Sequence, residues 1–176
     1  MKKIYKVIAL GLFLVLTQCA EKDISFLITE NAVGHLSKST EVDDLEIVFA
    51  QDSVVMDTTK GKKIKIHEKG GKHLLTLTPK TDSTATVENV RVFDSRYKTD
   101  KGISLASTFG EIQKKYPIKK VVTTINSIVI FPKESNLYFT IDKTELPSNL
   151  RYNNTNIEAV QIPDNAKIKY LMLGWE

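Results

Sequence analysis

The sequence predicts an α+β protein with mostly antiparallel strands and two helices packed on one face. Three observations support this fold class. Short segments in which apolar and polar residues alternate recur along the chain, as expected of half-buried strands. Turn residues separate several of these segments, as in β-hairpins. Two other segments carry apolar residues at helical spacing after a Ser-Thr pair, which is typical of a capped amphipathic helix.

In the first part of the chain, strands alternate with one helix. A helix is predicted over residues 41–50, because Ser39-Thr40 offers a cap and Val42, Leu45 and Phe49 follow at helical spacing. The expected strands are 24–28, 52–58, the two arms of a hairpin around Lys69-Gly70-Gly71-Lys72, and 84–93, with a turn at 31–34.

The second part begins with a loop at 94–102, interpreted as a solvated linker or, alternatively, as a recognition loop. The pattern Thr108-Phe109-Gly110-Glu111 is a capping box, and the helix that it starts ends at Pro117. Strands follow at Val121, around Ile128 and Ile130, over 137–141 and over 168–175, where Trp175 is expected to anchor the C-terminus on the core.

Blocks 39–79 and 107–142 share one order: a Ser-Thr cap, a helix, a Val-Val strand and a two-strand hairpin. Two explanations remain open. The blocks are two similar halves that arose by internal duplication, or the elements recur by chance, as they do in many α+β domains.

The composition indicates one globular domain over residues 24–176. With 41% apolar and 26% charged residues, the 176-residue chain is too apolar for a disordered protein. Without Lys2, Lys3 and Lys6, which lie in a segment expected to be removed, the 25 basic residues fall to 22 against 21 acidic ones. This near-neutral balance excludes nucleic-acid binding as an expected function.

Residues 1–18 are predicted to be a lipoprotein signal peptide. Basic residues precede an apolar run from Val7 to Leu16. As a helix this run would rise about 15 Å, roughly half the hydrocarbon thickness of a bilayer. Cleavage is therefore expected rather than a permanent membrane span.

Leu16-Thr17-Gln18-Cys19 resembles the lipobox of bacterial lipoproteins, although Gln18 stands where Gly, Ala or Ser is usual. The resemblance implies that Cys19, the only cysteine, is lipidated and becomes the new N-terminus, with 19–23 as a lipidated tether. In lipoprotein families an Asp directly after the cysteine often signals inner-membrane retention. Ala20 stands there in this chain, so the resemblance implies the outer membrane. Glu21-Lys22-Asp23 is either a solvated tether or a surface-export tag.

The candidate catalytic chemistry is sparse. His67 and His73 flank the predicted hairpin turn with Glu68 between them, and a five-residue turn would set them opposite each other as a candidate metal site. A tighter turn at Gly70-Gly71 would instead pair His67 with Leu74, and a solvated edge pair is the preferred interpretation. No nucleophile elbow or phosphate-binding loop is present in the sequence.

Residues 28–34, together with Ser39-Thr40, resemble the opening of a group of small bacterial envelope lipoproteins that includes the sigma-E-regulated lipoprotein of unknown function. The resemblance implies an envelope role without a known catalytic site. Gly102-Ile103-Ser104, leading through Ser107-Thr108 into the second helix, is similar to the small lipoprotein of the outer-membrane β-barrel assembly machinery.

The expected function is a non-catalytic interaction or envelope-maintenance role. The expected contacts are a membrane, through the lipid anchor, and envelope proteins, with no cofactor. The alternatives are a small-ligand-binding lipoprotein, a metal-dependent enzyme using His67 and His73, and an accessory of outer-membrane protein assembly.

Overall fold

The computed structural model describes residues 23–57, 59, 62–81, 85–152 and 156–175. They include a large sheet of eight strands in which all neighbours are antiparallel. In spatial order its strands are β4 (Asp52–Asp57), β5 (Lys63–Glu68), β6 (His73–Pro79), β7 (Val87–Val92), β12 (Ile168–Gly174), β11 (Leu137–Asp142), β10 (Ser127–Pro132) and β9 (Ile118–Thr123).

A small sheet and short helices complete the fold. The small sheet has the order β3 (Leu36–Ser37), β2 (Ala32–Val33), β1 (Leu27–Thr29) and β8 (Lys98–Thr99), and its β1–β8 pair is parallel. The α-helices are α1 (Leu45–Val48), α2 (Phe109–Lys115) and α3 (Ser148–Arg151), and 3-10 helices occupy Val42–Asp44, Lys143–Glu145 and Ala159–Gln161. The predicted α+β class with mostly antiparallel strands is confirmed.

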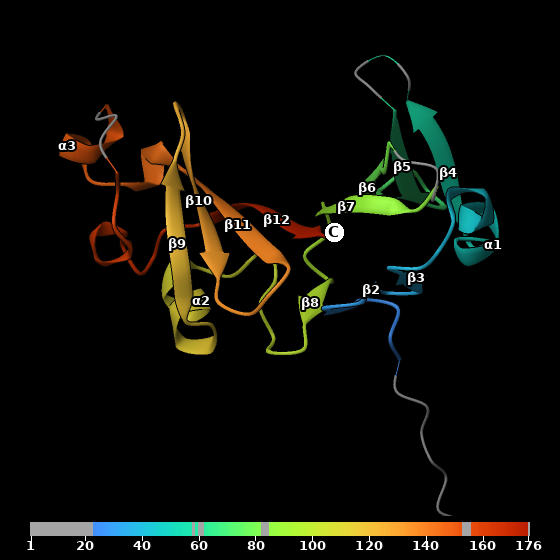
Figure 1. The fold of residues 1–176 in the computed structure, drawn as a ribbon, viewed down its shortest axis with the longest axis horizontal. Coiled ribbons are helices and arrows are strands. Elements are labelled where there is room, and N and C mark those ends of the chain that lie inside the picture. The colour runs from blue at the N-terminus through green and yellow to red at the C-terminus, as the bar shows by residue number, and fades with distance from the viewer. Residues whose placement is uncertain (1–22, 58, 60–61, 82–84, 153–155, 176) are drawn as a thin grey trace, which may run out of the picture.

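The large sheet consists of two similarly ordered halves joined at its centre. One half runs from α1 through β4, β5 and β6 to β7, and the other runs from α2 through β9, β10 and β11 to β12. The last strands of the halves, β7 and β12, pair with each other. In Figure 1, β4–β6 stand to the right and β9–β11 to the left of this junction. Each half therefore has a fourth strand beyond the three that the repeated sequence pattern predicts.

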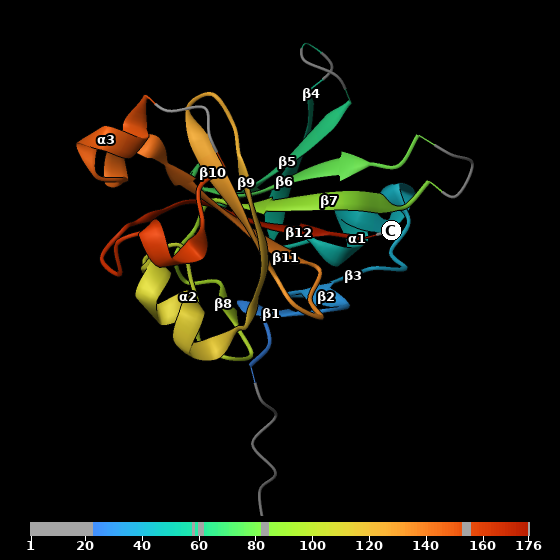
Figure 2. The ribbon, with the colours of Figure 1, turned by 60° about the vertical axis from the view of Figure 1, so that its left-hand side comes forward.

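Alternation along the strands divides the large sheet into a buried and an open face. Figures 1 and 2 show α2 and the small sheet on one side of the large sheet, and the side chains on that side form the core. Its strand residues, each at most 6% exposed, include Ile64, Ile66, Leu75, Leu77, Val90, Val92, Ile128, Ile130, Phe139, Ile141, Leu171 and Leu173.

The two predicted helices differ in how fully they form. The capping box at Thr108 is present, with the Thr108 N–H donating to Glu111 Oε2 over 2.8 Å, and the helix ends before Pro117 as predicted. The helix expected over 41–50 is shorter. It begins as a 3-10 turn and continues for only one α-helical turn, with no side-chain cap hydrogen bond at its start.

The predicted linker at 94–102 is a packed loop rather than a solvated one. Asp94 and Tyr97 are buried, and β8 adds Thr99 to the small sheet beside β1. Asp94 accepts hydrogen bonds from the Arg96 backbone and guanidinium, and Lys72 lies 2.9 Å from the same carboxylate. These contacts hold the loop against the β5–β6 hairpin, so the solvated-linker interpretation is wrong.

The C-terminal Trp175 anchors the chain end, as expected from its position. It is 1% exposed, and its Nε1–H donates to the Glu30 carbonyl oxygen over 3.0 Å. The Glu30 carboxylate accepts hydrogen bonds from Ser135 Oγ and the Asn136 N–H, each over 2.7 Å. This cluster ties the small sheet to the β10–β11 turn and to the end of β12.

Candidate functional site: the open face of the large sheet

The side of the large sheet away from α2 and the small sheet is called here the open face. Cross-strand pairing aligns its side chains in rows, because paired residues project to the same side. One row runs Val55, Lys65, Thr76, Arg91, Met172 and Tyr138 across β4, β5, β6, β7, β12 and β11. Tyr138 stacks on Phe131 of β10 with ring centroids 5.7 Å apart, and Phe131 pairs with Lys120 of β9. The row thus crosses all eight strands and both halves.

Arg91 lies at the centre of the open face, on β7 beside the junction with β12. Its guanidinium carbon is 3.6 Å from the centroid of the Tyr170 ring and 4.6 Å from that of the Phe93 ring. Contacts of a guanidinium with aromatic faces are favourable and limit its rotation. Among the residues that the structure describes, Arg91 has no ion pair and no hydrogen bond, and its Nε is enclosed without a partner.

Aromatic rings continue from Phe93 toward the edge of the first half. His73 stacks on Phe93 with centroids 3.8 Å apart, and His67 stacks on His73 at 4.8 Å. Phe93 is 38% exposed although it is a large apolar side chain. The centre of the open face is therefore a preformed layer of aromatic rings around a cation.

The hairpin register sets His67 opposite His73, and an irregularity between Ile66 and His67 produces it. The alternative in which a tighter turn pairs His67 with Leu74 is therefore wrong. The predicted position at a sheet edge is also wrong, because β5 and β6 are interior strands. His73 Nε2 lies 3.0 Å from the Leu75 carbonyl oxygen and 2.9 Å from Thr76 Oγ1. Burial lowers the pKa of His73, which favours its neutral form.

His67 and His73 do not belong to a larger set of metal ligands. Within residues 23–175, apart from the short undescribed gaps, no third His, Cys, Asp or Glu joins them in a cluster suited to a metal ion. Their rings face each other in a stack, and His73 is already engaged with the backbone and a hydroxyl. The arrangement favours packing and aromatic contact over metal binding.

A groove of about 730 Å³ adjoins the open face at the junction of the halves. Tyr138 and Phe131 line it together with Asn89 of β7, Lys120 of β9 and Trp175. The Asn89 side-chain amide donates to the Tyr138 hydroxyl, which joins β7 to β11 across β12. The groove combines ring surfaces with polar groups from both halves.

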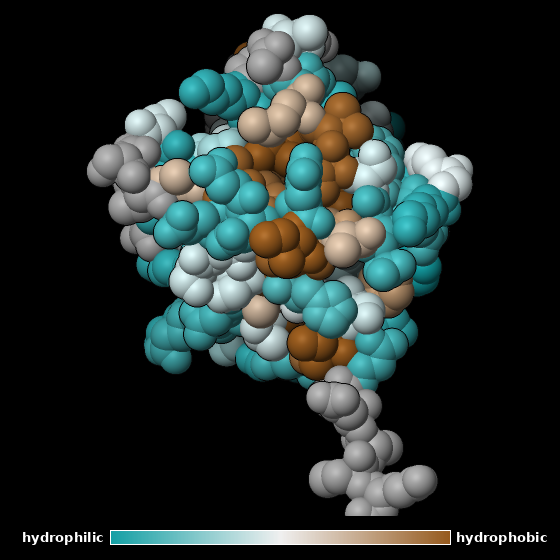
Figure 3. All heavy atoms as spheres, turned by 90° about the vertical axis from the view of Figure 1, so that its right-hand side faces the viewer, coloured by the Kyte–Doolittle hydropathy of each residue, from teal (hydrophilic) through white to brown (hydrophobic). Residues whose placement is uncertain are grey.

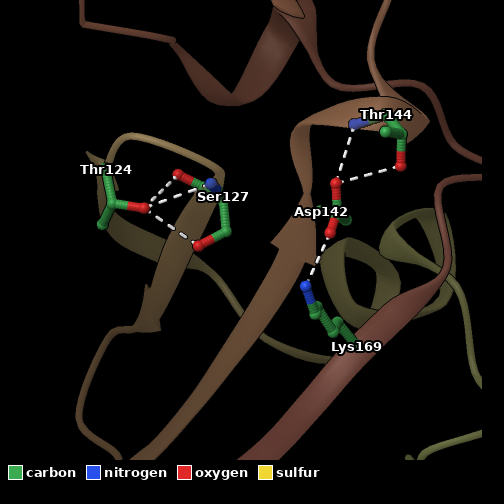
Figure 4. Close-up of polar contacts among 5 residues, drawn as sticks. All are labelled: Thr124, Ser127, Asp142, Thr144 and Lys169. Carbon is green, nitrogen blue, oxygen red and sulfur yellow. Dashed lines mark hydrogen bonds and ion pairs between the residues drawn. The ribbon is translucent and has the colours of Figure 1, made fainter.

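Asp142 is the last residue of β11 and contacts Thr144 and Lys169 (Figure 4). One carboxylate oxygen accepts from the Thr144 N–H and Oγ1, each over 3.0 Å, and the other lies 2.6 Å from Lys169 Nζ. These contacts, the Lys169 ammonium first, hold the pKa of Asp142 at about 2. In the neighbouring β9–β10 turn, Thr124 and Ser127 bond to each other. Asp142 is thus paired rather than poised as an acid or base.

A second groove, of about 430 Å³, contains residue types used in nucleophilic catalysis. Ser25 Oγ lies 3.4 Å from His35 Nε2, and Asp52 lines the same groove. Burial, followed by the charge of Glu68, raises the pKa of Asp52. Across the described part of the chain no hydrogen bond links His35 to Asp52, so the imidazole has no orienting partner of the kind that a catalytic triad needs.

Apolar atoms also gather on the α1 and β4 side of the molecule (Figure 3). Ile47 of α1 is 75% exposed and Met56 of β4 is 63% exposed. β4 is an edge strand, so its outer backbone groups face away from the sheet. Ile47 and Met56 are both aliphatic, whereas the open face also carries aromatic rings and cations. The open face therefore offers a partner more kinds of contact.

The sequence-predicted lipidation site lies outside the described residues. This applies to the signal peptide 1–18, to Leu16, Thr17, Gln18 and Cys19, and to the tether apart from Asp23. Within the described part of the chain, no helix combines the length and apolar character needed to cross a membrane.

No protein-family model matches the chain, and no curated protein matches it. A solved structure is similar in fold: the crystal structure of the uncharacterized protein yfeY from Escherichia coli. The TM-score is 0.53 at 15% sequence identity, and the match covers 84% of this chain and 99% of that chain. At this identity the similarity concerns the fold alone.

The open face was missed by sequence reasoning. Arg91, Phe93, Tyr138, Tyr170 and Met172 stand at polar-side positions of predicted strands, where bulky apolar or aromatic residues are unusual for a solvated face. That departure from apolar-in, polar-out alternation was the available signal. The convergence of these five residues depends on strand order, which alternation within one strand does not report.

Proposed function

We propose that this protein is a lipid-anchored bacterial envelope protein that binds a partner protein through the open face and has no catalytic activity. The observation that carries the proposal is the row of side chains across all eight strands, centred on Arg91, Met172 and Tyr138. Aromatic residues, Met and Arg are enriched at protein interfaces, and the few residues that dominate the binding energy are most often Trp, Tyr and Arg.

The rigidity of the open face supports a binding role. Its central residues stand on interior strands of a hydrogen-bonded sheet, and ring contacts orient Arg91, Phe93 and Tyr170. A surface ordered before binding loses little conformational entropy when a partner docks. Flexible loops and exposed lysine side chains would lose more conformational entropy on binding.

The position of the chain start supports the anchored arrangement. The described chain begins at Asp23, next to the small sheet and on the side opposite the open face (Figures 1 and 2). A lipid on Cys19, a few residues earlier, would hold the small-sheet side toward a membrane. The open face would then point away from the lipid, toward other envelope proteins, and Ala20 favours the outer membrane.

The non-catalytic part of the proposal is supported by the state of the candidate groups. His73 is stacked and hydrogen-bonded, Asp142 is paired with Lys169, and no described carboxylate is hydrogen-bonded to His35 beside Ser25. His73 and Asp142 thus each have structural partners that explain their positions. The metal-dependent alternative with His67 and His73 lacks a third ligand among the described residues.

The test is site-specific photo-crosslinking in living cells. A photoreactive residue at Met172, on the open face, is expected to form a discrete protein adduct. The same residue at Lys98, exposed on the small sheet, is the matched control and is expected to form none. Equal labelling at both positions, or no adduct at Met172, would reject the open face as the docking surface.

A second candidate function is small-ligand binding in the groove of about 730 Å³. Ring surfaces of Phe131 and Tyr138 beside Asn89 offer both stacking and hydrogen bonding. Native mass spectrometry of the protein recovered from cells tests this. A bound molecule that is lost on Tyr138→Ala, with no adduct at Met172, would favour the ligand-binding role over the protein-binding one.

A further inference from the structure

We infer that the partner presents an acidic segment to the open face and that a carboxylate of this segment binds the Arg91 guanidinium. The inference rests on the proposed docking function and names the chemistry of the partner. It follows from the charges on the open face, from the stacking of Arg91 and from the shape of the large sheet.

The charges of the open face are unequally compensated. Asp57 is paired with Lys65 over 2.7 Å, and Asp142 is paired with Lys169 over 2.6 Å. Three further cations, Lys63, Arg91 and Lys120, have no carboxylate partner among the described residues. They stand on β5, β7 and β9, so uncompensated positive charge extends from one half to the other. An acidic partner complements this surface.

Arg91 is distinguished from the two lysines by its surroundings. Lys63 Nζ donates to Thr78 Oγ1 over 2.7 Å, and Lys120 lies 4.6 Å from the Phe131 ring at the exposed edge strand. Arg91 instead contacts two rings at the centre of the sheet and has no acceptor for its terminal nitrogens among the described residues. A guanidinium whose plane is held by aromatic contacts is preorganised for a two-point contact with a carboxylate.

The shape of the large sheet favours a protein segment over a lipid surface. In Figure 1 the strands on both sides of β7 and β12 extend above the junction of these two strands, and β7 carries Arg91. A protruding loop or helix can approach this junction from above, whereas a flat bilayer meets the outer strands first. Nucleic acid is disfavoured because three dispersed cations neutralise few phosphates.

The experiment titrates the full-length protein in detergent with poly-L-glutamate and measures binding by calorimetry at low salt. Arg91→Gln is expected to weaken binding about tenfold, and Arg91→Lys is expected to restore only part of it because lysine lacks the planar fork. Lys98→Gln removes the same single charge from the small sheet and is expected to change binding less than about twofold. Equal losses for Arg91→Gln and Lys98→Gln would overturn the inference, because net charge alone would then explain binding.

Circular dichroism and the thermal midpoint establish that Arg91→Gln is folded. If that variant does not fold, Lys120→Gln, at an exposed edge position, replaces it, with an expected loss of about threefold. Binding to vesicles that contain phosphatidylglycerol, with no binding to poly-L-glutamate, would overturn the inference in favour of a lipid surface.

The Met172 crosslink separates this inference from the proposed function. Loss of the Met172 adduct in Arg91→Gln cells supports the acidic-partner inference. An undiminished adduct in those cells rejects the role of Arg91 but leaves the proposed docking function of the open face supported. Absence of the adduct in cells with unaltered Arg91 rejects the docking function itself.

Discussion

At the scale of single residues, Asp94 shows how tertiary contacts change the meaning of a charged side chain. Its carboxylate is fully enclosed, although it lies in a segment with the composition of a linker. Burial alone would raise its pKa, but hydrogen bonds from Arg96 and Lys72 outweigh this effect and lower the pKa to about 2. Arg96 also pairs with Glu68 and covers the Phe26 ring, so one cluster joins the loop, the hairpin and the small sheet.

Asp94→Ala is expected to lower the free energy of unfolding by about 2 kcal/mol. This loss of stability is smaller than the loss from breaking a fully buried ion pair. Arg96 and Lys72 are partly exposed, so water can solvate their charges once the Asp94 carboxylate is removed. Chemical denaturation measures the change. Asp43→Asn, at an exposed position, is the control and should leave stability within about 0.5 kcal/mol. An equal effect of both substitutions would contradict the role given to the Asp94 cluster.

The contribution of Asp94 to the free energy of unfolding depends on pH. The folded pKa of Asp94 is about 2 and its ordinary value is 3.8, so the unfolded chain binds a proton at higher pH than the folded protein. The contribution of Asp94 is therefore complete above pH about 4 and is lost as the pH falls toward 2. The stability difference between the original protein and Asp94→Ala should shrink across this range, and a constant difference would argue against the charge-based explanation.

At the scale of elements, local signals explain α2 better than α1. The α2 helix has both a reciprocal cap at Thr108 and a stop at Pro117, and its apolar stripe of Phe109 and Ile112 is buried. The α1 helix lacks a side-chain cap, and Ile47 on its surface is β-branched and largely exposed. Weak capping and a β-branched residue both disfavour helix extension, which accounts for the single turn.

Glu111→Ala is expected to destabilise the protein by about 1 kcal/mol, because it removes the acceptor for the Thr108 N–H. Glu111→Gln keeps a side-chain oxygen at the same position, so its destabilisation should be less than half that of Glu111→Ala. Thermal unfolding of the three proteins gives both values. If Gln and Ala cost the same, the carboxylate acts through the helix dipole rather than through the cap hydrogen bond.

The hairpin between β5 and β6 is an element whose existence was predictable and whose register was not. The alternating residues around Gly70 and Gly71 predicted two strands, and both glycines adopt positive φ angles in the turn. The irregularity between Ile66 and His67 then decides that His67 faces His73. A one-residue difference of this kind depends on packing against Phe93 of the neighbouring segment, which lies outside the hairpin.

At the scale of the whole molecule, the junction of β7 and β12 makes one continuous sheet from two similarly ordered halves. Arg91, Tyr170 and Met172 come together only because these strands pair. On the opposite side, the Glu30 contacts to Ser135 and Trp175 tie the small sheet to the second half. The protein thus has a bracing side next to the start of the described chain and a free side opposite it.

Cys19→Ala is expected to leave an uncleaved precursor without lipid, because the thiol is the predicted site of acylation. Gln18→Ala is the matched control, since Ala is common at that position of a lipobox, and it should be processed normally. Mass spectrometry of the purified protein detects the mass of the mature, acylated chain. Normal acylation of the Cys19→Ala protein would refute the lipobox interpretation.

The sequence by itself determined the α+β class, the α2 helix with its cap, the approximate positions of most strands and the anchoring of Trp175. These features depend on periodicity, caps and turns within about ten residues of chain. The tertiary structure alone decided the burial of Asp94, the pairing of β7 with β12 and the stacking of Arg91 between Phe93 and Tyr170. Such features join residues distant in sequence, and their free energy depends on which strands become neighbours, which no local pattern specifies.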